Sequence, residues 1–250
     1  MRKFNVAAAV LGIGLGFAAA APAANAASLI PQQEGEIQLT NLQTLDPNQT
    51  IDTNPFGFSV TSLEFDDAEK PGIEYGLSRL FVDAKGTENS YGSGTGAVKF
   101  GTRDGGTTEN ENEFWLRAAA IQTDGVASEG GELEVGRFLF EFERELEEIT
   151  IDFFDVESFG SGILEVNGNS VTDMLLVAGD NGNTQSLTLN NVSSLVLQLG
   201  NTNGVGKGDG VTISGVQAVE SVPEPTTTLS LGALAVAGMF GVKKRKNIKK

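Results

Sequence analysis

The chain has 250 residues, of which 33 are Asp or Glu and 17 are Lys or Arg, and it contains neither Cys nor His. The absence of Cys and His excludes disulfides, thiol nucleophiles, Cys/His zinc sites and catalytic Ser-His-Asp or Cys-His arrangements. The formal net charge of −16 repels phosphate backbones, so we expect no binding of nucleic acid.

Residues 1–26 have the pattern of a secretory signal peptide. A positively charged start is followed by an apolar run over 6–21, and Ala24-Asn25-Ala26 supplies the small-x-small sequence that a signal peptidase cleaves. An N-terminal membrane helix is the alternative, but the run is short, rich in Ala and Gly, and ends in a cleavage-type sequence. We therefore predict cleavage between Ala26 and Ala27 and export of the chain.

Residues 27–221 are predicted to form one all-β domain, a β-sandwich of jelly-roll type. Apolar residues alternate with a period of two in short runs, most clearly at 56–60, 138–142, 149–153 and 195–199. Segments rich in Gly, Asn and Asp separate these runs, which is typical of a sandwich of many short strands. Between two such runs, Asn167-Gly168 is predicted to close a hairpin.

Two segments of this domain are expected to lie outside the sheets. Residues 86–106 contain few apolar side chains and are interpreted as a long mobile loop. Residues 141–148 contain five Glu, which would repel one another on a short helix. This segment is therefore predicted to be a solvent-facing turn between two central strands.

A structural calcium ion is the one cofactor that the sequence suggests. Asp180, Asn181 and Asn183 place oxygen donors around Gly182, as in the first half of a calcium-binding loop. The position of the bidentate Glu in such a loop is occupied by Asn191. Asp and Asn also stabilise turns without any metal, so both interpretations stay open.

Carbohydrate binding is a second candidate, because sugars stack on exposed aromatic rings. Tyr75 and Tyr91 lie in polar surroundings and are predicted to form such a platform, whereas Trp115 lies in an apolar run and is expected in the core. Glycoside hydrolysis would need two facing carboxylates, and pairs such as Glu141 and Glu143 arise by chance among 33 acids. We expect no enzymatic activity.

Residues 222–250 combine a helix breaker, an apolar segment and a basic end. Pro223-Glu224-Pro225 precedes the 14 apolar residues of 229–242, and Lys243, Lys244, Arg245 and Lys246 follow them. A helix of that length spans only about 21 Å of a hydrocarbon core of about 30 Å. The basic end stays on the cytoplasmic side, so the domain lies outside. The segment is predicted to insert into the membrane transiently.

This arrangement resembles the C-terminal sorting signal of PEP-CTERM proteins, bacterial envelope proteins that exosortase-type membrane transpeptidases process. The resemblance covers the last tenth of the chain and implies export, transient anchoring, and cleavage near Pro223-Glu224-Pro225. It implies no activity for the domain in front of the signal. Within that domain, Leu133-Glu134-Val135-Gly136 and the segment up to residue 157 resemble the LEVG family of PEP-CTERM proteins.

The expected function is that of an exported, acidic and non-catalytic protein with a structural or surface role. Eight of the 17 basic residues lie in the two terminal segments, so the processed product has a net charge near −24. Its expected partners are signal peptidase and an exosortase-type transpeptidase, and its expected place is the cell envelope, the outer surface or the extracellular matrix. The alternative is a secreted carbohydrate-binding module of the extracellular polysaccharide matrix.

Overall fold

The computed structural model describes residues 27–66, 74–84, 88–92, 97–100, 113–121, 134–200 and 210–217. The predicted signal peptide and the predicted sorting signal lie outside these residues. Strands dominate the described part of the chain, which contains two short 3-10 helices and no longer helix. The all-β prediction is confirmed, and the finer assignment to the jelly-roll type stays a prediction.

The strands and 3-10 helices follow one another along the whole described chain. In order they are β1 (Ala27–Ser28), β2 (Gly35–Ile37), η1 (Pro47–Gln49), β3 (Thr50–Ile51), η2 (Asn54–Phe56), β4 (Phe58–Leu63), β5 (Phe65–Asp66), β6 (Glu74–Tyr75), β7 (Ser78–Ala84), β8 (Asn89–Tyr91), β9 (Val98–Phe100), β10 (Phe114–Ala120), β11 (Gly136–Phe154), β12 (Gly162–Val166), β13 (Asn169–Ser170), β14 (Thr184–Leu199) and β15 (Gly210–Gln217).

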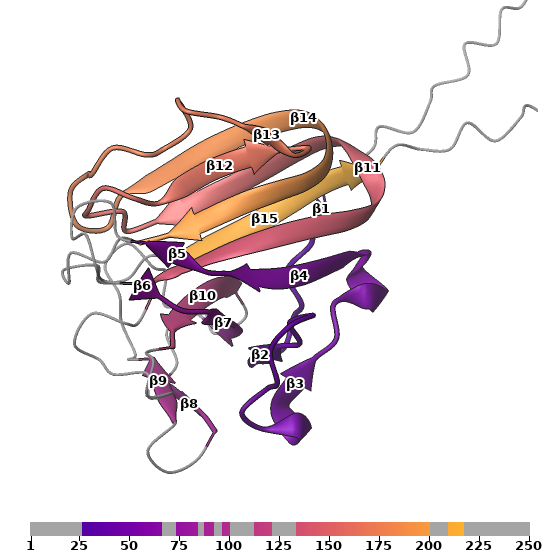
Figure 1. Cartoon of the computed structure of the whole chain (residues 1–250), viewed down its shortest axis with the longest axis vertical. Helices are drawn as coiled ribbons and strands as arrows, with labels where there is room; N and C mark the ends of the chain where they lie inside the picture. Colours follow the sequence, from indigo (N-terminus) through magenta and orange to yellow (C-terminus); the bar gives the residue numbers. More distant parts are fainter. Residues whose placement is uncertain are drawn as a thin grey trace, which may run out of the picture.

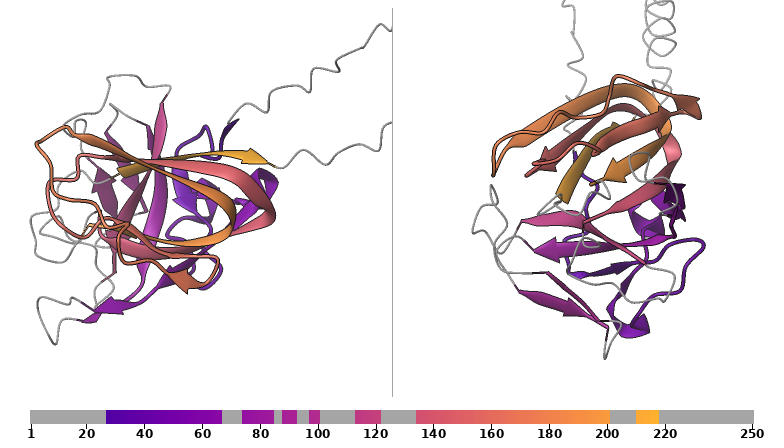
Figure 2. Two further views of the ribbon diagram at one scale, coloured as in Figure 1. Left: turned by 90° about the horizontal axis from the view of Figure 1, so that it is seen from above. Right: turned by 60° about the vertical axis from the view of Figure 1, so that its left-hand side comes forward.

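Eleven of the strands form one curled sheet. The order along it is β13-β12-β14-β11-β15-β10-β7-β2-β3, with β1 paired to β15 and β4 paired to β11. The strands β12 to β15 lie together on one side of the molecule, and β2, β3, β7 and β10 lie on the other (Figures 1 and 2). The apolar faces of the two parts meet in one core, which includes the fully buried rings of Phe138, Phe140 and Phe153. Trp115 is also buried, as predicted.

The predicted turn at 141–148 is wrong, because β11 continues through it as a single bent strand of 19 residues. β14 pairs with β11 on both sides of the bend, with a register shift between Glu141 and Leu146. Leu146 is buried, while residues 143–145, 147 and 148 are exposed, so the strict alternation of the strand is interrupted where its register shifts. The repulsion that disfavours a helix is tolerated here because the glutamates point into solvent.

The predicted hairpin at Asn167-Gly168 is confirmed. Asn167 and Gly168 have φ values of 52° and 72°, as a two-residue turn with positive φ at both positions requires, and they connect β12 to β13. The side chain of Asn167 also joins this turn to β14, since its Oδ1 accepts hydrogen bonds from the backbone N–H groups of Ser193 and Ser194.

The described parts of 86–106 form a hairpin instead of the predicted loop. β8 and β9 pair antiparallel and bury Tyr91, Val98 and Phe100 against Phe81. The ring centroids of Phe81 and Phe100 lie 5.5 Å apart, at an edge-to-face angle of 67°. Three apolar side chains were too few to show a period in the sequence, yet they are sufficient to attach the hairpin to β7 and β10.

Candidate functional site

A buried cluster of charged side chains lies where β7, β10 and the start of β11 meet. We call Asp83, Arg117 and Glu134 the buried ion cluster. Arg117 Nη1 lies 3.1 Å from Asp83 Oδ2, and Arg117 Nη2 donates a hydrogen bond to Glu134 Oε1. The side chain of Arg117 is only 3% exposed. Three charges in a core of this kind are tolerated only because they pair with one another.

Aromatic rings cover the guanidinium group of this cluster. The Cζ atom of Arg117 lies 4.3 Å from the ring centroid of Phe100 and 4.9 Å from that of Trp115. Both distances are within the range in which the face of an aromatic ring attracts a cation. The two rings thus shield the cluster from water and stabilise its cation.

Tyr91 is part of this buried structure, so its predicted role as an exposed stacking platform is wrong. The residue is 4% exposed, and its ring centroid lies 4.7 Å from that of Phe81. Its hydroxyl lies 3.0 Å from Val82 O and 3.1 Å from Asp83 Oδ1. The ring faces the core because β8 alternates toward Phe81. Tyr75 ends β6, and its side chain lies outside the described residues.

The left-handed conformation of Glu134 directs its carboxylate to Arg117. Glu134 has a φ of 68°, and its N–H donates to Ala118 O. Val135 is buried against Ala120, and Gly136 begins β11. A Cβ at Gly136 would lie 2.6 Å from Phe138 Cε2, so a side chain does not fit there. The described part of Leu133-Glu134-Val135-Gly136 therefore has a structural explanation at each position.

Sequence reasoning did not recognise Asp83 and Arg117 as a linked pair. A signal was present, because each lies in a mostly apolar strand. Arg117 is the one charge of β10 (Phe-Trp-Leu-Arg-Ala-Ala-Ala), and Asp83 shares β7 (Ser-Arg-Leu-Phe-Val-Asp-Ala) with Arg79 alone. Charged residues are almost never fully buried without a partner, so two such strands predict a pair when they are neighbours. That they are neighbours is known only from the fold.

A second buried carboxylate, Glu36 in β2, connects β2 to β7. Its Oε1 lies 2.5 Å from Arg79 Nη1, and its Oε2 accepts a hydrogen bond of 2.6 Å from the N–H of Leu45. Desolvation raises the pKa of Glu36, and the hydrogen bonds from Leu45 and Arg79 oppose this rise. Burial likewise raises the pKa of Asp83, against the positive charge of Arg117.

These shifts predict that the domain is more stable at mildly acidic pH than at alkaline pH. A carboxyl whose pKa is raised by folding binds its proton more tightly in the folded state. The contribution of this group to the free energy of unfolding is fully present below the pKa of the unfolded state, and it is lost as pH rises through the raised pKa of the folded state. Repulsion among the many surface carboxylates weakens as pH falls, which also favours the folded state at acidic pH. We expect the thermal unfolding midpoint to be higher at pH 5 than at pH 8.

Calorimetry over that pH range checks this prediction. The variant Glu36→Gln removes one of the two carboxyls and is expected to flatten the dependence, whereas the exposed control Asp173→Asn keeps the wild-type slope. A midpoint that falls steadily from pH 8 to pH 5 in the wild-type protein would contradict it.

The predicted calcium segment forms a turn whose donors and acceptors bind one another. Asn183 Nδ2 donates to Val156 O at 3.0 Å and to Asp180 O at 2.9 Å. The N–H of Gly182 donates to Asp155 Oδ1 at 2.6 Å, which fixes the turn to the end of β11. Asp180 and Asn181 are exposed. In the described ranges no three acidic side chains gather as a metal site would require, and calcium binding stays a prediction.

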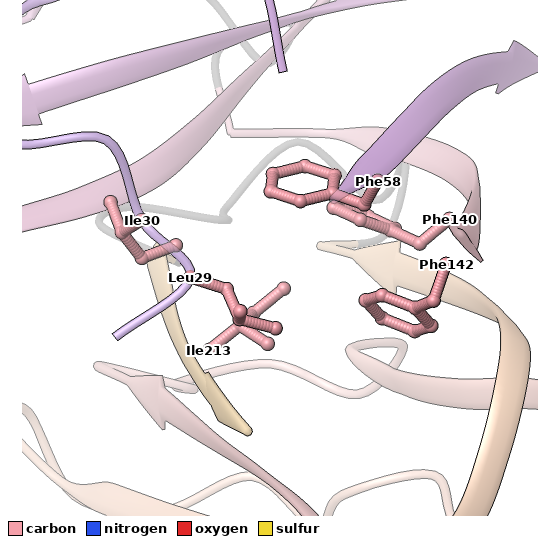
Figure 3. A pocket seen from close by; sticks show the side chains of 6 residues that line it. All are labelled: Leu29, Ile30, Phe58, Phe140, Phe142 and Ile213. Atoms are coloured by element: carbon pink, nitrogen blue, oxygen red, sulfur yellow. The ribbon is translucent and has the colours of Figure 1, made fainter. Parts of the chain in front are cut away.

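Two cavities lie elsewhere on the described surface. One is a polar groove of about 470 Å³ beside β2 and β3, lined by Gln38, Leu39, Leu42, Gln43, Thr44, Pro47 and Thr50. The other is apolar and lies between the start of the domain and the rings of Phe58, Phe140 and Phe142 (Figure 3). The apolar cavity has no room for a water molecule, whereas the polar groove has the volume to accept a small ligand without rearrangement.

None of the described segments forms a helix with the length and apolarity needed to cross a membrane. The predicted transient anchor, 229–242, lies outside those segments. Its assignment therefore depends on the amino-acid sequence and on the comparison with known families.

Comparison with known proteins identifies the C-terminal segment. Residues 221–246 match the family model of the PEP-CTERM protein-sorting motif, which includes Pro223, Glu224, Pro225 and the basic residues Lys243, Lys244, Arg245 and Lys246. Neither the curated proteins nor the solved structures include a match to the chain. The chain carries a PEP-CTERM sorting motif at residues 221–246, which implies export through the membrane to the cell envelope and sorting by an exosortase-type system.

Proposed function

We propose that this chain is a non-catalytic structural protein of the cell envelope or extracellular matrix. Its acidic β domain is delivered by the sorting motif and is released by cleavage near Pro223-Glu224-Pro225. The observation that carries the proposal is the sorting motif at 221–246, behind a sequence that begins with a signal-peptide pattern. Within the motif, the apolar segment 229–242 acts as a transient anchor, and the basic residues 243–246 act as the stop.

The use of charge inside the domain supports a structural role. Catalytic carboxylates and cations must reach a substrate, whereas Asp83, Arg117 and Glu134 neutralise one another beneath aromatic rings. Glu36 in the same way binds Arg79 and the backbone of Leu45. These buried charged groups thus join neighbouring segments of the sheet.

We further propose that the chain belongs to the LEVG family of PEP-CTERM proteins. The described residues of the motif support this, because Glu134 neutralises Arg117, Val135 fills the core and Gly136 lies where a Cβ would overlap a ring. A motif with these roles marks a shared fold and carries no chemistry of its own.

Intact mass spectrometry of the product from native cells tests the proposed processing. We expect a species that begins at Ala27 and ends between residues 223 and 226, recovered from the envelope or medium. Both Pro residues keep the junction extended for a protease, so the triple variant Pro223→Ala, Glu224→Ala, Pro225→Ala should retain Lys250 and stay with the membrane.

A chain with Thr227→Ser and Thr228→Ser, changed just outside the triplet, serves as the control and should be processed like the wild type. A wild-type product that still contains Lys250 would defeat the proposal of a removable sorting segment.

The second candidate function is binding of extracellular polysaccharide. The polar groove favours it, since its volume is typical of ligand sites and the side chains of Gln38, Gln43 and Thr44 offer amides and hydroxyls. The burial of Tyr91 removes one of the two rings that the sequence suggested. Calorimetric titration with matrix oligosaccharides, repeated with Gln43→Ala, separates this candidate from a purely structural role.

A further inference from the structure

The two ends of the described domain leave it side by side. β1 pairs antiparallel with β15, with Ala27 opposite Gly215 and Ser28 opposite Ser214. The N–H of Leu29 adds a hydrogen bond of 2.9 Å to Ile213 O. Because the strands are antiparallel, the start of β1 and the end of β15 lie at the same end of the domain (Figures 1 and 2).

The first residues of the domain are held beside β15 by the burial of their side chains. Leu29 and Ile30 are 8% and 2% exposed and line the apolar cavity next to Ile213 (Figure 3). A Cβ at Gly215 of β15 would lie 3.2 Å from Leu29 Cδ1 and 3.1 Å from Leu146 Cδ1. The glycine therefore leaves room for these two leucine side chains to pack closely against β15. The pairing of the ends is therefore part of the core.

The same end of the domain carries a dense cluster of acidic side chains. We call residues 141–148 the acidic bend; it contains five Glu and Arg144, and from Glu143 onward every side chain except the buried Leu146 is exposed. The end of β15 runs beside it, with Gln217 opposite Leu146 and Val216 opposite Glu148. β15 thus ends directly beside these carboxylates.

The distance from this end to the membrane segment is short. An extended chain spans at most about 3.6 Å per residue, so the six residues from Gln217 to Pro223 reach roughly 20 Å and the twelve to Leu229 roughly 40 Å. An anchored domain must therefore stay near the lipid surface. Its orientation there depends on which of its faces the lipid attracts or repels.

We propose that the end formed by β1, β15 and the acidic bend faces the membrane before sorting, and that repulsion between the acidic bend and anionic lipid holds the domain off the surface. This separation leaves the junction at 223–225 within reach of the processing enzyme. Repulsion of this kind acts within a Debye length, about 8 Å at physiological salt, so it prevents contact without opposing the tether. The inference rests on the proposed function, since it requires the C-terminal segment to insert.

Energy transfer from single labelled sites to a lipid-linked acceptor tests the orientation. The chain has no Cys, so one substitution creates a unique site for a fluorophore. Asn190→Cys is exposed opposite Glu148 on β14, and Ser90→Cys is exposed on the distant β8. The full chain, made in a host without the exosortase-type enzyme, is reconstituted in vesicles of phosphatidylglycerol and phosphatidylcholine.

We expect higher transfer from position 190 than from position 90. Equal transfer, or higher transfer from position 90, would overturn the proposed orientation. Flotation of the vesicles is measured in parallel: a chain that does not float with them refutes transient anchoring, and the inference with it, whereas a chain that floats without the expected difference refutes the inference alone.

Charge removal tests the electrostatic part. Glu143→Gln, Glu145→Gln and Glu147→Gln are combined in one chain, and the matched control combines Glu64→Gln, Glu88→Gln and Asp173→Asn, three exposed acids away from the bend. The bend variant should show increased transfer from position 190 on anionic vesicles, and no increase on vesicles of phosphatidylcholine alone. The control should match the wild type. A bend variant indistinguishable from the wild type would overturn the electrostatic role.

Discussion

Replacement of Arg117 by Met is expected to lower the free energy of unfolding by about 3–5 kcal/mol, the range for breaking a buried ion pair from one side. The change removes the cation but leaves the carboxylates of Asp83 and Glu134 in the core. It also removes the group between the rings of Phe100 and Trp115. Urea denaturation of the domain at pH 7 measures the difference.

Arg144→Met is the matched control, because Arg144 is an exposed arginine on β11 and its loss should change stability by no more than about 0.5 kcal/mol. Combining Arg117→Met with Asp83→Asn and Glu134→Gln should recover part of the loss, since neutral side chains replace the orphaned charges. If Arg117→Met costs no more than the control, the buried ion cluster does not stabilise the domain.

Replacement of Gly136 by Ala is expected to cost about 2–3 kcal/mol through overpacking. The added Cβ would lie 2.6 Å from Phe138 Cε2 and 2.8 Å from Ser78 Cβ, and both neighbours are fully buried. The ring of Phe138 cannot move without disturbing the core around it. Thermal and urea unfolding of the purified domain provide the measurement.

Gly168→Ala separates this effect from the general cost of changing a glycine. Gly168 has a positive φ of 72° and no atom within 4 Å of its added Cβ, so only backbone strain of about 1 kcal/mol is expected there. A smaller loss at Gly136 than at Gly168 would show that the close packing at the start of β11 is unimportant.

Together the two experiments ask whether Glu134, through Arg117, and Gly136 stabilise the fold. If both changes are costly, the motif around these residues is explained by stability alone.

Local sequence patterns predicted the structure correctly where it depends on residues that are adjacent in the sequence. Asn167-Gly168 predicted a hairpin because the required positive φ values are a property of those two residues. Trp115 was expected in the core because the residues around it are apolar, and it is buried. The all-β content followed from alternation in the same way.

Predictions failed where distant strands decide the outcome. The segment 141–148 appeared too charged for a strand, but β14 provides a partner on both sides of the bend. Tyr91 appeared exposed among polar neighbours, but Phe81 of β7 packs on its ring. In both cases the deciding contact comes from another strand of the sheet, which no local pattern reveals.

The amino-acid sequence alone was enough to establish the delivery signal and the class of fold. A sorting motif is read by a membrane enzyme as a linear segment, and alternation follows from the geometry of a single strand. Only the tertiary structure joined Asp83, Arg117 and Glu134, and only it placed the two ends of the domain on neighbouring strands beside the acidic bend. These contacts link residues far apart in the chain, so they exist only once the sheet has formed.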